Sequence, residues 1–241
     1  MSLSKNHIKL ITSLQQKKYR QKHKLFVAEG VKVVDELLNS NFELSQLFAT
    51  QDYSTASEKL TIISDEELKK ISKLKTPNKV LGLFKIPEDV STKESGLIVA
   101  LDGINDPGNL GAIIRLCDWF GVSKLVCSKN TVDCYNQKVV QASMGSLTRV
   151  QIVYRELLPF LEKITLPTFI ADMDGKNVYE ETMPKEAILV MGNEANGISN
   201  EIRTIIDSKI SIPRFGEQQE TESLNVATAA AILLSEFKRG N

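Results

Sequence analysis

The sequence predicts an α/β protein in two parts. A small N-terminal α/β domain spans residues 1–90, and a larger C-terminal domain with a mostly parallel, doubly wound sheet spans residues 97–241. Three observations support this. Short apolar runs alternate with helical stretches along the second half of the chain. Residues 86–96, IPEDVSTKESG, are polar and read as a linker. The 241 residues are 42% hydrophobic, enough to bury a sizeable core.

Composition excludes several classes of protein. No apolar run approaches the roughly 18–20 residues that span a bilayer, and the N-terminus lacks the apolar core of a signal peptide. Cys117, Cys127 and Cys134 show no C-x-x-C spacing, so we expect thiols in a reducing cytoplasm and no disulfide or zinc framework. We therefore expect no membrane association and no metal. The formal net charge is +0, so composition alone does not indicate a nucleic-acid partner.

The first 28 residues are basic and contain no Asp or Glu. Ile8, Ile11 and Leu14 recur at helical spacing, which predicts a helix with an apolar face inward and lysines outward. Such a face is either merely solvated or attracts phosphate groups without regard to sequence. The candidate phosphate contacts are Lys17, Lys18, Arg20 and Lys22.

The rest of the N-terminal domain alternates strands and helices. Residues 24–30, 44–50, 61–64 and 80–85 are strand-like, and residues 31–39 are helical. Ser64 and Glu67 form a capping-box pattern that opens a helix ending near Lys73. This alternation is typical of a compact three-layer domain.

The C-terminal domain has the short apolar strands of a buried parallel sheet. They are expected at residues 97–101, 124–128, 150–153, 168–173, 187–191 and 209–213. A dinucleotide site needs G-x-G-x-x-G directly after the first strand, but that strand runs into DGINDPGNLG. We therefore expect the ligand site at the carboxyl ends of later strands.

The segment 187–236 predicts two turns and a helix start at one edge of the sheet. Unpaired backbone groups at such places hold polar ligands. Gly192 and Gly197 allow close backbone approach and positive φ, and Ser223 is a suitable N-cap for the final helix. The alternative is three ordinary connections between strands and helices.

Three polar residues in apolar surroundings are candidates for chemistry. Asn109 is expected to cap a helix that begins near Leu110. Arg115 has apolar sequence neighbours, so we expect it to be at least half-buried and to pair with Glu194 or with a substrate phosphate. Asn225 lies at the start of the final helix and needs a ligand or a backbone partner.

Three motifs in order carry a family resemblance. DPGNLGAIIRLCDWFG (106–121), LVMGNEANGIS (189–199) and SIPRFG…ESLNVATAAAILL (211–234) resemble those of the SpoU (TrmH-type) RNA ribose 2′-O-methyltransferases of the SPOUT superfamily. The resemblance covers residues 97–241. More loosely, FVAEGVKVVDELL (26–38) is similar to that family's L30e-like substrate-binding domain.

The resemblance implies transfer of a methyl group from S-adenosylmethionine to a ribose 2′-hydroxyl of structured RNA, either rRNA or tRNA. It also implies a deep trefoil knot and a homodimer that pairs through the C-terminal domains. The implied catalytic residues are Asn109, Arg115, Glu194, Ser223 and Asn225; the implied cofactor-binding residues are Met191, Gly192, Asn193, Gly197, Ile212, Pro213, Leu224, Asn225 and Val226. Lys17, Lys18, Arg20 and Lys22 would contact the RNA. Arg115 would act either as a base or as an anion holder.

The sequence departs from the common family pattern at Arg214, at Ala195 and in a longer loop over residues 216–222. Two other functions stay open. One is an RNA-binding protein that keeps the fold without turnover, and the other is a methyltransferase that acts on a base or a small molecule.

Overall fold

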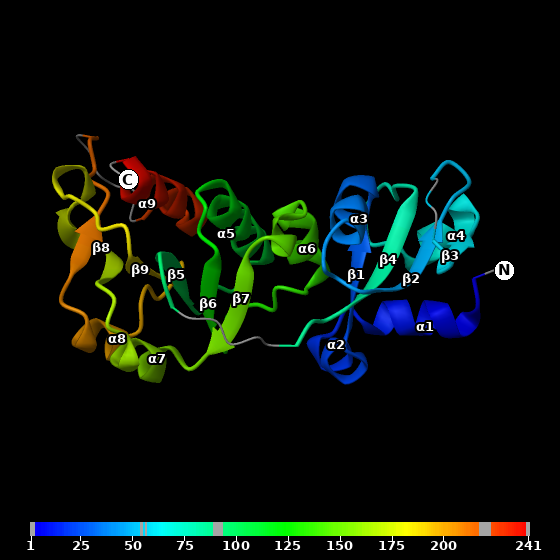
Figure 1. The fold of residues 1–241 in the computed structure, drawn as a ribbon, viewed down its shortest axis with the longest axis horizontal. Helices are drawn as coiled ribbons and strands as arrows, with labels where there is room; N and C mark the ends of the chain where they lie inside the picture. The colour runs from blue at the N-terminus through cyan, green and yellow to red at the C-terminus, as the bar shows by residue number, and fades with distance from the viewer. Residues whose placement is uncertain (1–2, 54, 56, 89–93, 217–222, 240–241) are drawn as a thin grey trace. The chain divides into compact units, whose positions relative to one another are not determined.

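The computed structural model describes residues 3–53, 55, 57–88, 94–216 and 223–239 (Figure 1). The chain folds into two compact units. The first contains Met1–Asp89 and Asp133–Thr148, and the second contains Val90–Val132 and Arg149–Asn241. The first unit is therefore larger than the predicted segment 1–90, because a stretch from the middle of the chain belongs to it. No helix among the described residues is long and apolar enough to cross a membrane.

The first unit is a four-stranded sheet between helices, as the three-layer prediction requires. The strands, in sheet order, are β1 (Leu25–Glu29), β4 (Val80–Lys85), β2 (Leu44–Ala49) and β3 (Leu60–Ile62). The helices are α1 (Lys5–Ser13), α2 (Lys17–His23), α3 (Val31–Leu38), α4 (Asp65–Ile71) and α6 (Gln137–Ser143). Helices α1 and α4 pack on one face through a shared core that includes Ile11 and Leu68, while α3 covers the other (Figure 1). The predicted capping box of Ser64 and Glu67 is confirmed at the start of α4.

A buried arginine attaches the later segment to the first unit. The Arg20 side chain is 3% exposed, and its Nε and Nη2 donate to Asp133 Oδ2 at 2.8 and 2.6 Å. Its Nη1 donates to the carbonyls of Leu14 and Gln15 at 2.8 and 2.9 Å. The prediction that Arg20 contacts phosphate is wrong, since its guanidinium faces inward and its charge is already paired.

A buried carboxylate makes a second attachment. Glu29, at the end of β1, is 2% exposed and accepts hydrogen bonds from Ser72 Oγ (2.5 Å), the Lys73 backbone N–H (2.9 Å) and Gln137 Nε2. Gly145, after α6, has φ +94°, and a Cβ there would lie 2.6 Å from Glu36 Cγ. Residues 133–148 are thus an integral part of this unit.

The second unit is a six-stranded sheet in which every neighbouring pair is parallel. In sheet order, the strands are β10 (Lys209–Ser211), β8 (Thr168–Asn177), β9 (Ala187–Gly192), β5 (Leu97–Asp102), β6 (Lys124–Ser128) and β7 (Gln151–Arg155). Helices α5 (Pro107–Trp119) and α9 (Val226–Arg239) lie on one face, and α7 (Leu157–Lys163) and α8 (Asn200–Ile205) on the other (Figure 1). Two 3-10 turns span Ser146–Thr148, in the first unit, and Val178–Glu180. The α/β class with a doubly wound sheet is confirmed, and the trefoil knot stays a prediction.

Two helix starts differ from the prediction. Asp106, with Pro107 in the first helical turn, caps α5 by accepting from the Asn109 backbone N–H at 2.8 Å. Asn225 caps α9, because its Oδ1 accepts from the backbone N–H groups of Ala227 and Thr228 at 3.0 and 3.2 Å. Neither Asn109 nor Ser223 is therefore an N-cap, and both side chains are left for other contacts.

Candidate active site

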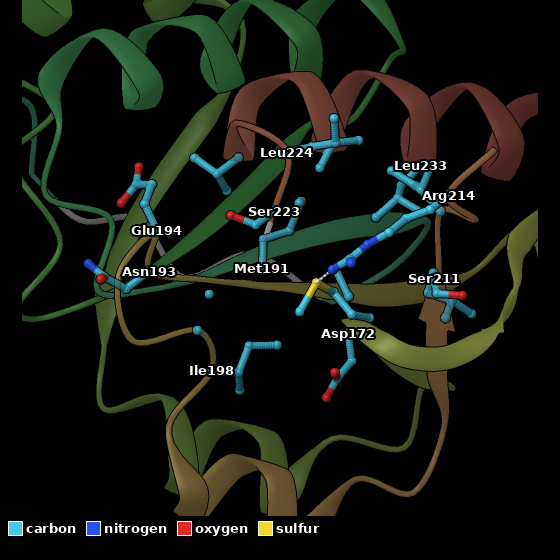
Figure 2. Close-up of a pocket in the computed structure, with 18 of the residues that line it drawn as sticks. Asp172, Met191, Asn193, Glu194, Ile198, Ser211, Arg214, Ser223, Leu224 and Leu233 are labelled. Carbon is cyan, nitrogen blue, oxygen red and sulfur yellow. Dashed lines mark hydrogen bonds between the residues drawn. The ribbon is translucent and has the colours of Figure 1, made fainter. Parts of the chain in front are cut away.

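A pocket of about 1100 Å³ opens at the carboxyl ends of β8, β9 and β10, beside the start of α9 (Figure 2). This is the edge of the sheet that the strand pattern predicts. Most of the predicted cofactor residues line it: Met191, Gly192, Asn193, Gly197, Ile212, Pro213, Leu224 and Val226. Glu194 and Ser223 line it as well. Asn225 does not, and neither do Asn109 and Arg115.

The floor of the pocket is a tight glycine turn after β9. Asn193 and Gly197 exchange two backbone hydrogen bonds of 2.9 and 2.8 Å, which fold the turn back on itself. A Cβ on Gly192 would lie 2.3 Å from the carbonyl carbon of Gly197, so only glycine fits. Gly197 has φ +65°, the left-handed region that favours glycine. The first glycine thus serves close approach and the second serves the backbone angle.

The Asn193 side chain holds this turn in place. Its Nδ2 donates to the Gly103 carbonyl at 2.6 Å, and its Oδ1 accepts from the backbone N–H groups of Ala195 (2.9 Å) and Asn196 (3.1 Å). The side chain therefore ties the turn to the end of β5. Since both polar atoms of the Asn193 side chain are used in this way, we expect Asn193 to shape the pocket and not to bind a ligand through its amide group.

Much of the pocket lining is apolar. The apolar residues that line it are Met191, Ile198, Ile212, Leu224, Val226 and Leu233. Val226, Ala229 and Leu233 come from one face of α9 at spacings of three and four residues. Ala229 and Leu233 were not among the predicted residues, although their helical spacing from Val226 is visible in the sequence.

An ion pair braces the other side of the turn. Arg203, on α8, donates from Nη1 to Asp172 Oδ2 and from Nε to the Ile198 carbonyl at 3.0 Å. The Asp172 side chain is only 7% exposed, so its charge is paired largely away from water. Neither Arg203 nor Asp172 was among the predicted site residues. A signal for Asp172 was present, because it is an acidic residue in the apolar run of β8, and ligands bind near the carboxyl ends of parallel strands.

Arg214 brings a positive charge into the pocket. Its Nη2 lies 3.0 Å from Met173 Sδ, and Figure 2 shows the side chain extending from the rim towards the centre of the pocket. This is one of the positions at which the sequence departs from the common family pattern.

Three polar side chains from three separate segments form a directed chain of hydrogen bonds. Asn225 Nδ2 donates to Asn109 Oδ1 at 2.9 Å, and Asn109 Nδ2 donates to Glu194 Oε1 at 2.6 Å. Because two backbone N–H groups of α9 bind Asn225 Oδ1, its amide nitrogen must face Asn109. Because Asn109 Oδ1 must then accept from Asn225, Asn109 Nδ2 must face Glu194. Each side chain therefore donates to the next, and the last acceptor is the Glu194 carboxylate.

The structure does not bring Arg115 into this chain. Its side chain is exposed on α5, and no hydrogen bond or ion pair joins it to another described residue. The prediction of a half-buried Arg115 paired with Glu194 is therefore wrong. Buried residues of α5 follow the stripe Leu110, Ile113, Ile114 and Cys117, and Arg115 lies off this stripe.

The other predicted site residues are on the surface. Ser223 is exposed at the pocket, and Lys17, Lys18 and Lys22 are exposed on α2, where Lys18 Nζ lies 4.9 Å from the centre of the Tyr19 ring. Among the residues that the structure describes, no group of three or more His, Cys, Asp or Glu side chains is placed to hold a metal ion.

Comparisons with known proteins agree with this architecture. The model of the SpoU rRNA Methylase family matches residues 96–235, and that of the MRM3-like substrate binding domain matches residues 5–82. The 23S rRNA (guanosine(2553)-2'-O)-methyltransferase RlmP of Bacillus subtilis is 28% identical over 231 residues, which cover 92% of this chain and 91% of that protein.

Two solved structures share the whole fold. A putative RNA methyltransferase of the TrmH family from Porphyromonas gingivalis is 36% identical, with a TM-score of 0.89 and 99% of each chain covered. An AdoMet-bound rRNA methyltransferase from Sinorhizobium meliloti is 26% identical, with a TM-score of 0.85 over 100% of this chain and 98% of that one. Since the family model spans more than half of the sequence, the chain belongs to the SpoU rRNA methylase family.

Proposed function

We propose that this protein transfers a methyl group from S-adenosylmethionine to a ribose 2′-hydroxyl of RNA, with ribosomal RNA as the substrate class. The observation that carries the proposal is the chain of Asn225, Asn109 and Glu194 beside the glycine-turn pocket. It places an oriented amide and a carboxylate next to a pocket of the right size for a nucleoside cofactor. The names of the relatives support the same reaction.

The pocket fits S-adenosylmethionine in size and chemistry. Small-molecule and cofactor pockets are typically roughly 300–1,000 Å³ and mainly apolar with a few placed polar groups, and this pocket of about 1100 Å³ is as large as the largest of them. Here the apolar side chains of the lining would enclose the adenine, and the backbone around Gly192 would approach the ligand closely because no Cβ intervenes. The bound cofactor would supply an already activated sulfonium methyl group.

The side chains then have two tasks, alignment and proton removal. Glu194 is exposed at the pocket, and its carboxylate is an acceptor for the proton of an incoming hydroxyl. Asn109 holds that carboxylate by donating to Oε1, and Asn225 holds Asn109. Holding the acceptor hydroxyl in a fixed position beside the methyl group lowers the entropic part of the barrier to transfer.

We further propose that the exposed Arg115 holds an RNA phosphate, and that two chains pair through their C-terminal units to complete the site. Arg115 and Trp119 lie one turn apart on α5, and Trp119 is 84% exposed, which is unusual for an indole. Replacing Trp119 by Asp should shift the protein to monomer in sedimentation. Arg115→Lys should retain part of the activity only if positive charge is all that the site needs.

The two units would divide the labour. The first unit carries four more Lys and Arg than Asp and Glu, and the second carries four fewer, although the whole chain is neutral. The positive unit is therefore suited to hold RNA phosphates, chiefly through Lys17, Lys18 and Lys22.

We also propose a cytoplasmic location for the protein. The three cysteines are buried thiols, the form that a reducing compartment maintains.

The test is the chemistry of the product. Purified protein is incubated with ribosomal RNA and S-adenosylmethionine labelled in the methyl group, and the RNA is then hydrolysed in alkali. Ribose methylation removes the nucleophile for cleavage, so label should appear in alkali-resistant dinucleotides. A substrate with a 2′-deoxy nucleotide at the target should accept no label. Label in mononucleotides would assign the reaction to a base, and absence of transfer with intact RNA binding would favour a non-catalytic binder.

A further inference from the structure

A second lysine-rich stretch lies outside the residues assigned to the proposed site. Residues 68–87 contain six lysines and neither Asp nor Glu. Three of these lysines lie near carboxylates. Lys69 and Lys70 are in the last turn of α4, whose first turn is acidic, and Lys85 forms an ion pair with Glu43 at 2.7 Å. The other three lie in residues 72–79, which we call the α4–β4 loop.

The loop lysines are Lys73, Lys75 and Lys79. All three are exposed, and none forms a hydrogen bond through its ammonium group or an ion pair with another described residue. Three such charges within seven residues repel one another unless an anion lies among them. The loop is thus a concentrated positive site without a partner in this part of the chain.

The backbone of the loop is nevertheless fixed at both ends. At its start, Glu29 accepts from Ser72 Oγ and from the Lys73 backbone N–H, and Ser72 Oγ accepts from the Leu74 N–H at 3.1 Å. At its end, the Lys79 carbonyl accepts from the Thr50 backbone N–H at 2.8 Å. A loop that only needs to be soluble does not require these anchors.

Glu29 accepts its hydrogen bonds from neutral groups, so it does not pair with the ammonium group of a loop lysine. A buried carboxylate must be compensated, and a lysine ammonium would be the strongest nearby partner. Instead, Glu29 is satisfied by a hydroxyl, a backbone N–H and the amide of Gln137, all of them neutral. The fold therefore positions the loop with a buried negative charge while its three ammonium groups point to solvent.

We propose that the α4–β4 loop is a second phosphate-binding element for the RNA backbone, separate from the lysines of α2. This inference rests on the proposed function, because RNA is the polyanion that function supplies. β1 runs from the end of α2 to Glu29, and its five residues span about 13 Å at roughly 3.3 Å per residue. The two elements are therefore attached at opposite ends of β1, a strand longer than the screening length of about 8–10 Å near physiological salt.

The experiment measures RNA affinity of the full chain as a function of salt. The loop variant is Lys73→Gln/Lys75→Gln/Lys79→Gln, which leaves every backbone anchor in place. The α2 variant is Lys17→Gln/Lys18→Gln/Lys22→Gln. The matched control removes three exposed lysines of the second unit, Lys163→Gln/Lys176→Gln/Lys185→Gln, with the same change in net charge.

Each lost phosphate contact should lower the log–log salt slope by roughly 0.7–0.9. We expect the loop variant to lose about two to three units of slope, the control almost none, and the combined loop and α2 variant the sum of both losses. S-adenosylmethionine affinity and thermal unfolding should match wild type throughout.

Two results overturn the inference. If the loop variant has the slope of the control while wild type binds RNA, the loop lysines are only solvated. If the losses of the two triple variants do not add, the elements are one contact and the claim of separate sites is wrong. A wild-type protein that does not bind RNA at all removes the proposed function itself, which is a distinguishable outcome.

Discussion

Replacing Gly192 by alanine should damage cofactor binding more than any other single methyl group added around the pocket. The new Cβ would lie 2.3 Å from the Gly197 carbonyl carbon and 2.4 Å from the Ile198 nitrogen, both of them backbone atoms. The turn must therefore open by about 1 Å, a distance that puts the two hydrogen bonds between Asn193 and Gly197 beyond normal length.

The magnitude follows from those two bonds and the overpacking. Each backbone hydrogen bond contributes about 0.5–1.5 kcal/mol, and overpacking typically costs about 1–3 kcal/mol. A loss of about 2–3 kcal/mol at the pocket corresponds to a roughly 30- to 150-fold weaker Kd for S-adenosylmethionine. Calorimetric titration of the purified variant measures this directly, with thermal unfolding recorded in parallel.

Two other glycines of the same pocket serve as controls. Gly216→Ala adds its Cβ to open space, with nothing within 4 Å and no positive φ, and should bind like wild type. Gly197→Ala should lie between the two, since φ +65° costs an alanine about 1 kcal/mol or more. The reasoning fails if Gly192→Ala binds the cofactor as tightly as Gly216→Ala does.

Three further predictions concern other parts of the chain. Asn109→Ala should lower kcat about tenfold or more and leave the cofactor Kd unchanged in titrations, because Asn109 orients Glu194 without lining the pocket; a change in Kd alone would refute this. Arg20→Ala should cost about 3–5 kcal/mol in urea unfolding by leaving Asp133 without its partner, and the double variant with Asp133→Ala should recover part of that loss; equal losses in both variants would contradict it. Burial raises the pKa of the Cys117 thiol to about 12, so the folded state favours the neutral form. Stability should therefore fall as pH rises from about 9 towards 12, and less steeply in Cys117→Ala; identical pH profiles would disprove the assignment.

The strands and the edge of the sheet that holds the pocket were predictable from the sequence. Apolar runs flanked by turns place all six strands of the second unit within a few residues of their bounds, since a strand buried on both faces needs uninterrupted apolar residues. The glycine turn was predictable for a similar reason. Glycine is needed at both positions for a local reason. A Cβ on Gly192 would collide with the backbone of Gly197, and Gly197 itself has a positive φ.

Some errors had a local signal that was misread. Asp106-Pro107 is the stronger helix-start pattern, but Asn109 is also a suitable cap three residues later. Arg115 has apolar neighbours in sequence, which predict burial, but helical residues share an environment with those three and four positions away. Both errors come from reading the chain linearly where the helix has a period of 3.6 residues.

Other features had no local signal. Arg20 is buried because of Asp133, which lies 113 residues away, and Asp172 meets Arg203 across 31 residues. Such pairs exist only once the chain has folded. Sequence reasoning from composition therefore counts Arg20 among the surface cations, although its partner makes it part of the interior.

The position of residues 133–148 has a consequence for how this protein can be divided. The chain leaves the first unit after Asp89, returns for these sixteen residues and leaves again at Thr148. A continuous N-terminal fragment would keep Arg20 and Glu29 but lose Asp133 and Gln137, so a cation and an anion would face the interior with fewer partners. Gene fusions or domain exchanges cut near residue 90 would therefore carry an incomplete module. The functional modules of this chain are contiguous in space, while their coding segments are interleaved.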